Sequence, residues 1–404
     1  MKIAIVSDTH IGYERFAEDA LKQATEALEK ASQMADIILL PGDVFDKRAP
    51  RPDVIAQSIN LFRELSKKRW AARVVEFNGR GTKCYTDVPV VAISGTHERT
   101  AEGKDNPLNL LGLAGLLVDT SEATTIVEKN GERVAIYGLG GISEERVKEK
   151  LAELKPTPIS GAFNVFMLHQ SIYEILPFSD DFIHYDDLPS GFDLYVNGHI
   201  HSRVDATVHG KKFLIPGSTV LTQFKEGEQG NKGFILFDTK SYTYEFIEIE
   251  TREFVVRNLE FSDATPKEVD QRCEAEIEAI LAKGKAKPII KINLKGTIKS
   301  GFTGSDMPIH ALLLKYSEKA VLEIESGKLV SPEVQMDIEG IRENRIGEMP
   351  IKELGMNIFS ARLKELDYDQ SSISASDLFN ILANAQNKEK AVKEAMELLD
   401  STAS

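Results

Sequence analysis

The sequence has few cysteines, no excess of basic residues and no long apolar segment. Its two cysteines, Cys84 and Cys273, stand far apart and belong to no cluster with ligand spacing. This excludes a disulfide framework and argues against a zinc knuckle. The formal net charge of −14 argues against nucleic-acid binding through overall basicity, because Lys and Arg must neutralise phosphates in that mode. An enzyme that meets phosphates through bound cations is compatible with this charge.

No uninterrupted apolar run approaches the roughly 18 residues that a membrane helix needs. The opening MKIAIVSDTH also lacks the basic region, long apolar stretch and small-residue cleavage site of a secretion signal. We therefore expect a cytoplasmic protein without membrane association. With 404 residues, of which 42% are hydrophobic and 28% charged, the chain should fold into two or three globular domains.

Acidic and imidazole side chains, together with the hydroxyl of Thr96, follow short aliphatic runs in the first half of the chain, where each run is expected to end as a β-strand. These residues are Asp8, His10, Asp43, Asp46, Thr96, His97, Glu98, His169, His199 and His201. Any one of them alone is more often a turn or cap residue. Five of the chain's 8 histidines fall at these strand ends, however. Independent turn residues would not concentrate in this way.

Helical patterns lie between the predicted strands, for example at residues 17–33 and 52–65. Alternation of strand and helix predicts a layered α/β fold, in which loops at the carboxyl ends of strands converge on one edge of a sheet. Imidazole nitrogens together with carboxylate oxygens form a ligand set that suits manganese, iron or zinc. A carboxylate such as Asp43 can bridge two cations about 3.5 to 4 Å apart, the spacing of two-metal phosphoryl-transfer sites.

The motifs SDTHIG, PGDVFD, SGTHER, MLHQ and NGHIHS occur in this order over roughly the first 220 residues. In combination they resemble the calcineurin-like metallophosphoesterases, which implies two packed β-sheets flanked by helices. The opening SDTHIGY, the segment GDVFDKRAPRP and the expected small α/β domain and helical tail narrow the resemblance. They are similar to the nuclease subunit of the DNA double-strand-break repair complex, the Mre-eleven or SbcD family.

This resemblance implies a DNA nuclease with duplex 3'-to-5' exonuclease and single-strand endonuclease activity, in the nucleoid of a prokaryote. The nuclease would be a homodimer within a two-plus-two complex. Its implied partner is an SMC-like coiled-coil ATPase of the Rad-fifty or SbcC type. The implied cofactors are two manganese ions, with magnesium, iron or zinc left open. The resemblance assigns one ion to Asp8, His10, Asp43 and His201, the other to Asp43, His169, His199 and residue 96, and catalysis to His97.

Two positions depart from the pattern of this family. Thr96 stands where a metal-binding Asn is usual, and Asp46 stands where many members carry a histidine. A hydroxyl is a shorter and poorer neutral donor than a carboxamide oxygen. We therefore expect either a loosely held second ion or compensation by Asp46, Glu98 or water.

Three regions are expected: a nuclease domain at 1–245, a small α/β DNA-capping domain at 246–333, and a linker with a helical ATPase-binding tail at 334–404. The segment NPLNLLGLAGLLV is expected to form a helix that is capped by Asn106 and apolar on nearly all sides. Such a helix is buried inside its own domain or, as the resemblance implies, shared with the 52–65 helix in a dimer bundle. Two other functions stay open, namely a phosphodiesterase for a small substrate and a weakly catalytic scaffold for the ATPase.

Overall fold

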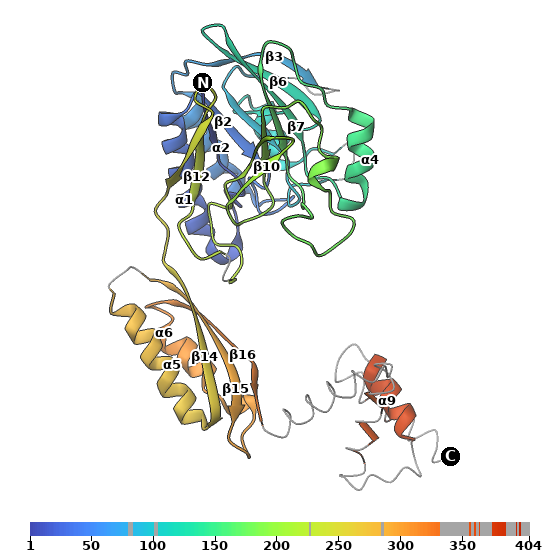
Figure 1. Cartoon of the computed structure of the whole chain (residues 1–404). Coiled ribbons are helices and arrows are strands. Elements are labelled where there is room, and N and C mark those ends of the chain that lie inside the picture. Colours follow the sequence, from blue (N-terminus) through green and yellow to red (C-terminus); the bar gives the residue numbers. More distant parts are fainter. Residues whose placement is uncertain are drawn as a thin grey trace. The chain divides into compact units, whose positions relative to one another are not determined.

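The computed structural model describes residues 1–79, 84–100, 104–225, 228–283 and 287–331, and in the tail 355–356, 359–360, 363, 374–384, 393 and 396. The chain forms two compact units, Met1–Val256 with Lys285–Ile289, and Arg257–Gly284 with Ile290–Ser404 (Figure 1). The division at 245/246 and 333/334 that we expect from the sequence stays a prediction. Within the described ranges, no helix is both long and apolar enough to cross a bilayer.

Two β-sheets form the centre of the first unit. In spatial order, the 6-stranded sheet contains β13 (Thr243–Glu248), β12 (Gly233–Asp238), β1 (Lys2–Ile5), β2 (Ile37–Pro41), β4 (Val90–Ile93) and β5 (Val118–Asp119). The 7-stranded sheet contains β10 (Val204–Val208), β11 (Lys211–Ile215), β9 (Leu194–Asn197), β8 (Phe163–Leu168), β7 (Glu132–Leu139), β6 (Ala123–Lys129) and β3 (Arg73–Gly79). The expected sandwich of two sheets is confirmed.

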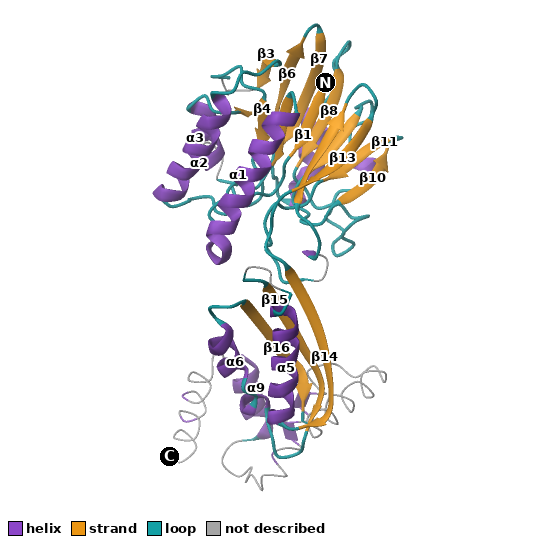
Figure 2. Cartoon of the chain, turned by 90° about the vertical axis from the view of Figure 1, so that its left-hand side faces the viewer, coloured by secondary structure: helices purple, strands orange, loops and turns teal. Residues whose placement is uncertain are grey.

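Helices cover the outer faces of the sandwich. They are α1 (Ala17–Met34), α2 (Pro52–Ser66) and α3 (Pro107–Leu113) on the first sheet (Figure 2) and α4 (Glu144–Leu154) on the second (Figure 1). Short 3-10 turns lie at Glu14–Phe16 and Tyr185–Asp187. Strand periodicity explains the layers, because successive side chains point to opposite faces. In β1, Ile3 and Ile5 enter the core between the sheets, whereas Ala4 contacts the core beneath α1 and α2.

Parallel pairing brings several strand ends to the same edge. β1, β2 and β4 pair in parallel in the first sheet, and β7, β8 and β9 do so in the second. The carboxyl ends of parallel strands lie together at one edge of a sheet. All of the strands that precede the candidate site residues belong to these two parallel groups.

The structure confirms the helices expected at 17–33 and 52–65, and corrects the one expected from Asn106 onward. Asn106 caps α3 as predicted, since its side chain accepts from the backbone of Asn109. The helix ends at Leu113, however, because Gly115 adopts a positive φ of 68° and the chain then turns into β5. The apolar run is therefore a short helix, a turn at residues 114–115 and a buried segment that leads into β5, which sequence periodicity alone does not distinguish.

The second unit contains a three-stranded sheet of β14 (Phe254–Ala264), β15 (Ile289–Ile298) and β16 (Val321–Val330), with α5 (Pro266–Leu281), α6 (Ile309–Tyr316) and a 3-10 turn at Gly304–Asp306. The predicted alternation in β15 is confirmed, since Ile290, Ile292 and Leu294 are buried. In the tail, α9 (Ala375–Asn384) is a described helix. The linker expected from 334 onward, and most of the tail, lie outside the described residues.

The core between the sheets supplies a stability prediction. Phe237 is fully buried there and contacts the rings of Phe163 and Tyr242. Phe237→Ala should lower the free energy of unfolding by about 3 to 5 kcal/mol, through lost burial and the cavity that remains. The matched control is Phe178→Ala, because the Phe178 side chain is 81% exposed. Denaturant unfolding measures both, and equal losses would contradict the assigned core.

Candidate metal centre

Left-handed backbone conformations mark the loops at the carboxyl ends of the parallel strands. Asp8, His10, Asp43 and His199 have φ angles of 50°, 43°, 49° and 69°. This region is unfavourable for residues other than glycine and costs on the order of 1–3 kcal/mol each. Inter-loop hydrogen bonds compensate: the Asp8 and His10 amides donate to the carbonyls of Gly42 and Asp43, at 3.3 and 3.1 Å. The backbone is thus fixed where side chains must converge.

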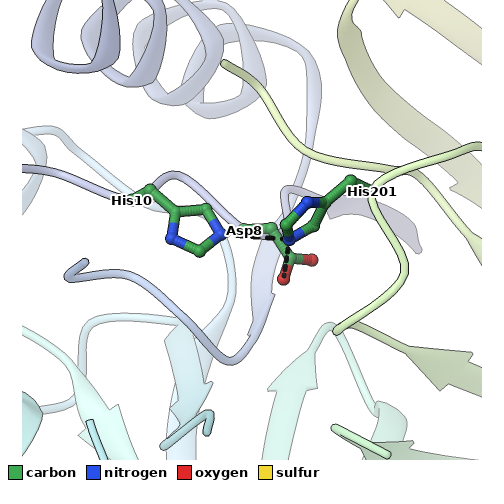
Figure 3. Close-up of side chains that lie close together, drawn as sticks. All are labelled: Asp8, His10 and His201. Atoms are coloured by element: carbon green, nitrogen blue, oxygen red, sulfur yellow. Dashed lines mark hydrogen bonds and ion pairs between the residues drawn. The ribbon is translucent and has the colours of Figure 1, made fainter. Parts of the chain in front are cut away.

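The first cluster consists of Asp8, His10 and His201. The Nε2 atoms of His10 and His201 lie 3.2 Å apart, and His201 Nε2 is 3.9 Å from Asp8 Oδ1. Figure 3 shows the two rings side by side, with the Asp8 carboxylate close to His201, and the ring planes meet at 84°. Two ring nitrogens and a carboxylate oxygen can ligate one cation from this arrangement. The donor set suits a borderline divalent metal such as manganese, iron or zinc.

The second cluster consists of Asp43, His169 and His199. His169 Nδ1 donates to the carbonyl of Pro41 at 2.8 Å, which turns Nε2 toward Asp43 Oδ2 at 3.2 Å. Apart from this ion pair with Asp43, the buried Nε2 has no hydrogen-bond partner among the described residues, so it is available to a cation that Asp43 also contacts. Thr96 Oγ1 lies 3.4 Å from His199 Nδ1, so residue 96 does border this cluster.

The charges of the second cluster are strongly coupled. Burial disfavours ionisation of Asp43, yet the rings of His169, His10 and His97 hold its pKa well below the usual range. Burial likewise opposes a charged His169, but Asp43 raises the pKa of His169 to about 9. Burial and the neighbouring His169 lower the pKa of His199 to about 4. Asp43, His169 and His199 would hold a divalent cation here, and its charge would take the place of the His169 proton beside Asp43.

Glu98 and Asp46 are not members of the second cluster, although Glu98 lies close enough to interact electrostatically with Asp43 and His169. Glu98 is fully buried, and its two carboxylate oxygens accept from the amides of Phe45 and Gly95 at 2.9 and 2.8 Å. It therefore joins the loops after β2 and β4, and burial raises its pKa to about 8. Asp46 Oδ1 lies beside the first cluster instead, 3.3 Å from His10 Nδ1.

His97 is placed differently from the other histidines. Its side chain is 46% exposed, and its Nδ1 donates to the carbonyl of Asp46 at 2.7 Å. Its amide donates to Asp43 Oδ1 at 2.8 Å. The ring lies 4.9 Å from that of His10, between centroids, so His97 borders the metal-binding residues. With Nδ1 engaged, Nε2 is the ring atom left to exchange a proton with a bound substrate.

Several contributors to the site carry no signal in the sequence. Asn197 and the backbone of Gln170 exchange two hydrogen bonds, of 2.9 and 3.0 Å, that hold the ends of β8 and β9 together. Ser171 contacts His199, and Thr222 contacts His201, each with a glutamate behind it. The only available hint is the position of Ser171 two residues after His169. Thr222 and the glutamates come from parts of the chain without a motif.

Gly198 is required by a close approach of three segments. A Cβ at this position would lie 2.0 Å from the Pro41 carbonyl oxygen and 2.7 Å from His169 Nδ1. It would therefore displace the hydrogen bond that orients His169. This gives a physical reason for the glycine that precedes the two closely spaced histidines.

Gly198→Ala should reduce divalent-metal affinity at least tenfold and lower stability by about 1–3 kcal/mol, the usual cost of overpacking. Gly304→Ala is the control, because nothing lies within 4 Å of the added Cβ there. Isothermal calorimetry with manganese and thermal unfolding measure the two effects. Unchanged metal affinity in Gly198→Ala would contradict the packing described here.

Curated relatives of this chain are DNA double-strand break repair proteins named Mre11. The protein from Encephalitozoon cuniculi is 28% identical over 312 residues, covering 71% of this chain and 54% of the relative. The protein from Methanopyrus kandleri is 27% identical over 374 residues, covering 84% and 75%. The protein from Archaeoglobus fulgidus is 28% identical over 290 residues, covering 63% and 60%. The chain thus spans about half of the first relative's length.

The family model described as calcineurin-like phosphoesterase matches residues 1–203. This segment is half of the 404-residue chain and contains every member of both clusters as well as His97. The two-sheet sandwich and the mixed carboxylate and imidazole site agree with the match. The chain therefore belongs to the calcineurin-like phosphoesterase family.

Proposed function

We propose that this protein is a two-metal DNA nuclease that processes DNA ends in double-strand-break repair. One observation carries the proposal. Two clusters that share no residue, Asp8–His10–His201 and Asp43–His169–His199, lie at one edge of the sandwich, and the exposed His97 forms a third group with His10 and Asp46 beside them. Asp43 interacts electrostatically with both His169 and His10, so its carboxylate is suited to bridge the two clusters.

The residues of the site have separate tasks in this proposal. Asp8, His10, Asp43 and His201 would hold one manganese ion, and Asp43, His169, His199 and Thr96 the other. When bound, such ions lower the pKa of a water molecule and neutralise charge on phosphate oxygens. His97 would act through its Nε2 atom. It would either stabilise the transition state or protonate the leaving oxygen. The Asp46 carbonyl keeps its ring in the required orientation.

The relatives support DNA as the substrate over a small phosphodiester. The names of these relatives refer to DNA double-strand break repair, and the match to the M. kandleri protein covers 84% of this chain. It therefore extends beyond residues 1–203, into the unit that contains the β14–β16 sheet. That unit would cap the DNA. A phosphodiesterase for small substrates would need no such addition.

Assembly with a second copy and with an ATPase is part of the proposal. Three apolar side chains on α2 and α3 are exposed: Ile59, Leu110 and Leu113, at 36%, 43% and 53%. They offer an apolar surface for a homodimer, while Leu108 and Leu111 of α3 belong to the core. The tail, which contains α9, would bind the coiled coil of an SMC-like ATPase.

His97→Ala tests the catalytic proposal. We expect manganese affinity to stay nearly unchanged and cleavage of labelled duplex ends to fall by about two to four orders of magnitude, the usual contribution of a positioned proton-transfer group. The control is His310→Ala, since His310 lies on an exposed face of α6 far along the chain. Calorimetry and a manganese-supplemented cleavage assay, with and without the ATPase, provide the readouts.

Loss of metal together with activity would identify His97 as a ligand. A wild-type protein that cleaves small phosphodiesters and no DNA would overturn the substrate assignment. Absence of any cleavage, with intact metal and DNA binding, would favour a scaffold for the ATPase.

Thr96→Asn tests the second ion. A carbonyl oxygen of longer reach should strengthen binding at this cluster about tenfold, or about 1.4 kcal/mol. The manganese concentration for half-maximal cleavage should fall accordingly, while the tighter binding phase stays in place. Thr96→Val, which removes the hydroxyl at nearly constant volume, should shift the weaker phase the other way. Equal second-site affinities in all three proteins would mean that residue 96 donates nothing.

A further inference from the structure

Each histidine of the NGHIHS motif contacts a side-chain hydroxyl, and each of these hydroxyls contacts a glutamate carboxylate. Thr222 Oγ1 contacts His201 Nδ1 and lies 2.9 Å from Glu228 Oε1. Ser171 Oγ lies 3.0 Å from His199 Nε2 and 2.9 Å from Glu144 Oε1. These are two hydrogen-bond relays, Glu228–Thr222–His201 and Glu144–Ser171–His199, built from different parts of the sequence. Each relay contacts the ring nitrogen that faces away from the metal clusters.

The direction of the hydrogen bonds in the first relay follows from the donors around Glu228. Its carboxylate accepts from Lys232 Nζ at 3.0 Å and from the amides of Thr222 and Gln223 at 3.2 and 2.8 Å. An ionised carboxylate has no proton to donate, so Glu228 acts only as a hydrogen-bond acceptor. The single hydroxyl proton of Thr222 therefore points to Glu228. The oxygen of Thr222 is then an acceptor toward His201, so His201 Nδ1 must carry the ring proton.

The hydrogen bonds of the second relay run in the same direction, from the imidazole through the hydroxyl to the glutamate. Ser171 is buried, with 3% exposure, and donates its hydroxyl proton to Glu144 in the first turn of α4. Its oxygen can only accept from His199, which places the ring proton of His199 on Nε2. The lone pair of His199 is then on Nδ1, the atom 3.4 Å from Thr96 Oγ1 in the second cluster.

We propose that Glu228 and Glu144, each acting through one hydroxyl, fix opposite tautomers of His201 and His199. His201 is held with Nε2 unprotonated and His199 with Nδ1 unprotonated. The lone pair of each of these nitrogens is thereby directed at the metal cluster to which the histidine belongs. Thr222, Glu228, Ser171 and Glu144 are positioning residues. The inference rests on the proposed metal centre, but the tautomers exist without metal and can be measured separately.

The direct test reads the ring nitrogens in metal-free protein. In protein labelled with ¹⁵N-histidine, two-bond proton–nitrogen correlation spectra distinguish protonated from bare ring nitrogens. We expect His201 to be protonated at Nδ1 and His199 at Nε2. Replacement of each histidine by glutamine assigns its signals. The opposite tautomer, or a rapidly exchanging mixture at either ring of the wild type, would overturn the proposal.

Paired variants separate the hydroxyls from general packing. Thr222→Val keeps the shape and removes the hydroxyl, whereas Thr222→Ser keeps the hydroxyl. Loss of such supporting partners typically weakens metal binding about 10–100-fold. We expect this loss for Thr222→Val at the tighter manganese site and for Ser171→Ala at the weaker one. Thr222→Ser should stay within about threefold of the wild type, since its oxygen still accepts from His201.

Charge is tested separately on α4. Glu144→Gln should allow the Ser171 hydroxyl to rotate toward His199 and thereby mix the His199 tautomers. Glu145→Gln removes the same charge from the adjacent, exposed position and should leave the tautomers and metal affinity unchanged. Equal effects of the two substitutions would overturn the proposal, because they would reflect charge alone.

The two hydrogen-bond relays can be tested independently, so the inference remains testable if one variant does not fold. Should Thr222→Val unfold, the Ser171→Ala and Glu144→Gln spectra still decide the inference. A wild-type protein without affinity for divalent cations would defeat the proposed function. The tautomers in the metal-free spectra would nonetheless confirm or contradict the positioning of the two rings.

Discussion

Asp43 is the residue on which the metal centre most depends. Its carbonyl accepts from the His10 amide, its Oδ1 accepts from the His97 amide, and its Oδ2 faces His169. Three loops from both sheets are thereby tied to one residue. Asp43 achieves this from a left-handed conformation with φ of 49°, and nearby Gly42 and Gly95 leave no room for a Cβ. The strain is tolerated because the surrounding contacts determine the backbone completely.

The site is therefore built from buried groups that compensate one another. Glu98 is buried among amides, His169 is paired with Asp43, and Glu228 is paired with Lys232. Burial alone would raise the pKa of Glu228, yet the nearby His201 ring and the hydrogen-bonded ammonium of Lys232 lower it to about 2. Such networks are costly when incomplete. A bound divalent cation would complete the network, because it would supply a positive partner for the imidazole and carboxylate atoms that lie close together in the two clusters.

Prediction from sequence succeeded where a local pattern has one structural solution. Alternating apolar residues identified the strands, such as β15 with its buried Ile290, Ile292 and Leu294. Prediction failed for the segment from Asn106 to Val118, where leucines at many positions fit a helix as well as a turn and strand. The choice there depends on Gly115 and on pairing of β5 with β4, which is a contact between distant residues.

The sequence by itself determined which residues have metal-binding chemistry and that they follow strands, because ligand type and strand periodicity are local properties. Only the tertiary structure decided how they group. It places Thr96 beside His199, assigns Glu98 to the amides of Phe45 and Gly95, and leaves Asp46 next to His10. It also recruits Ser171, Glu144, Thr222 and Glu228 behind the two histidines of the NGHIHS motif. These contacts join segments far apart in the chain, and packing of the two sheets sets their distances, which no local pattern encodes.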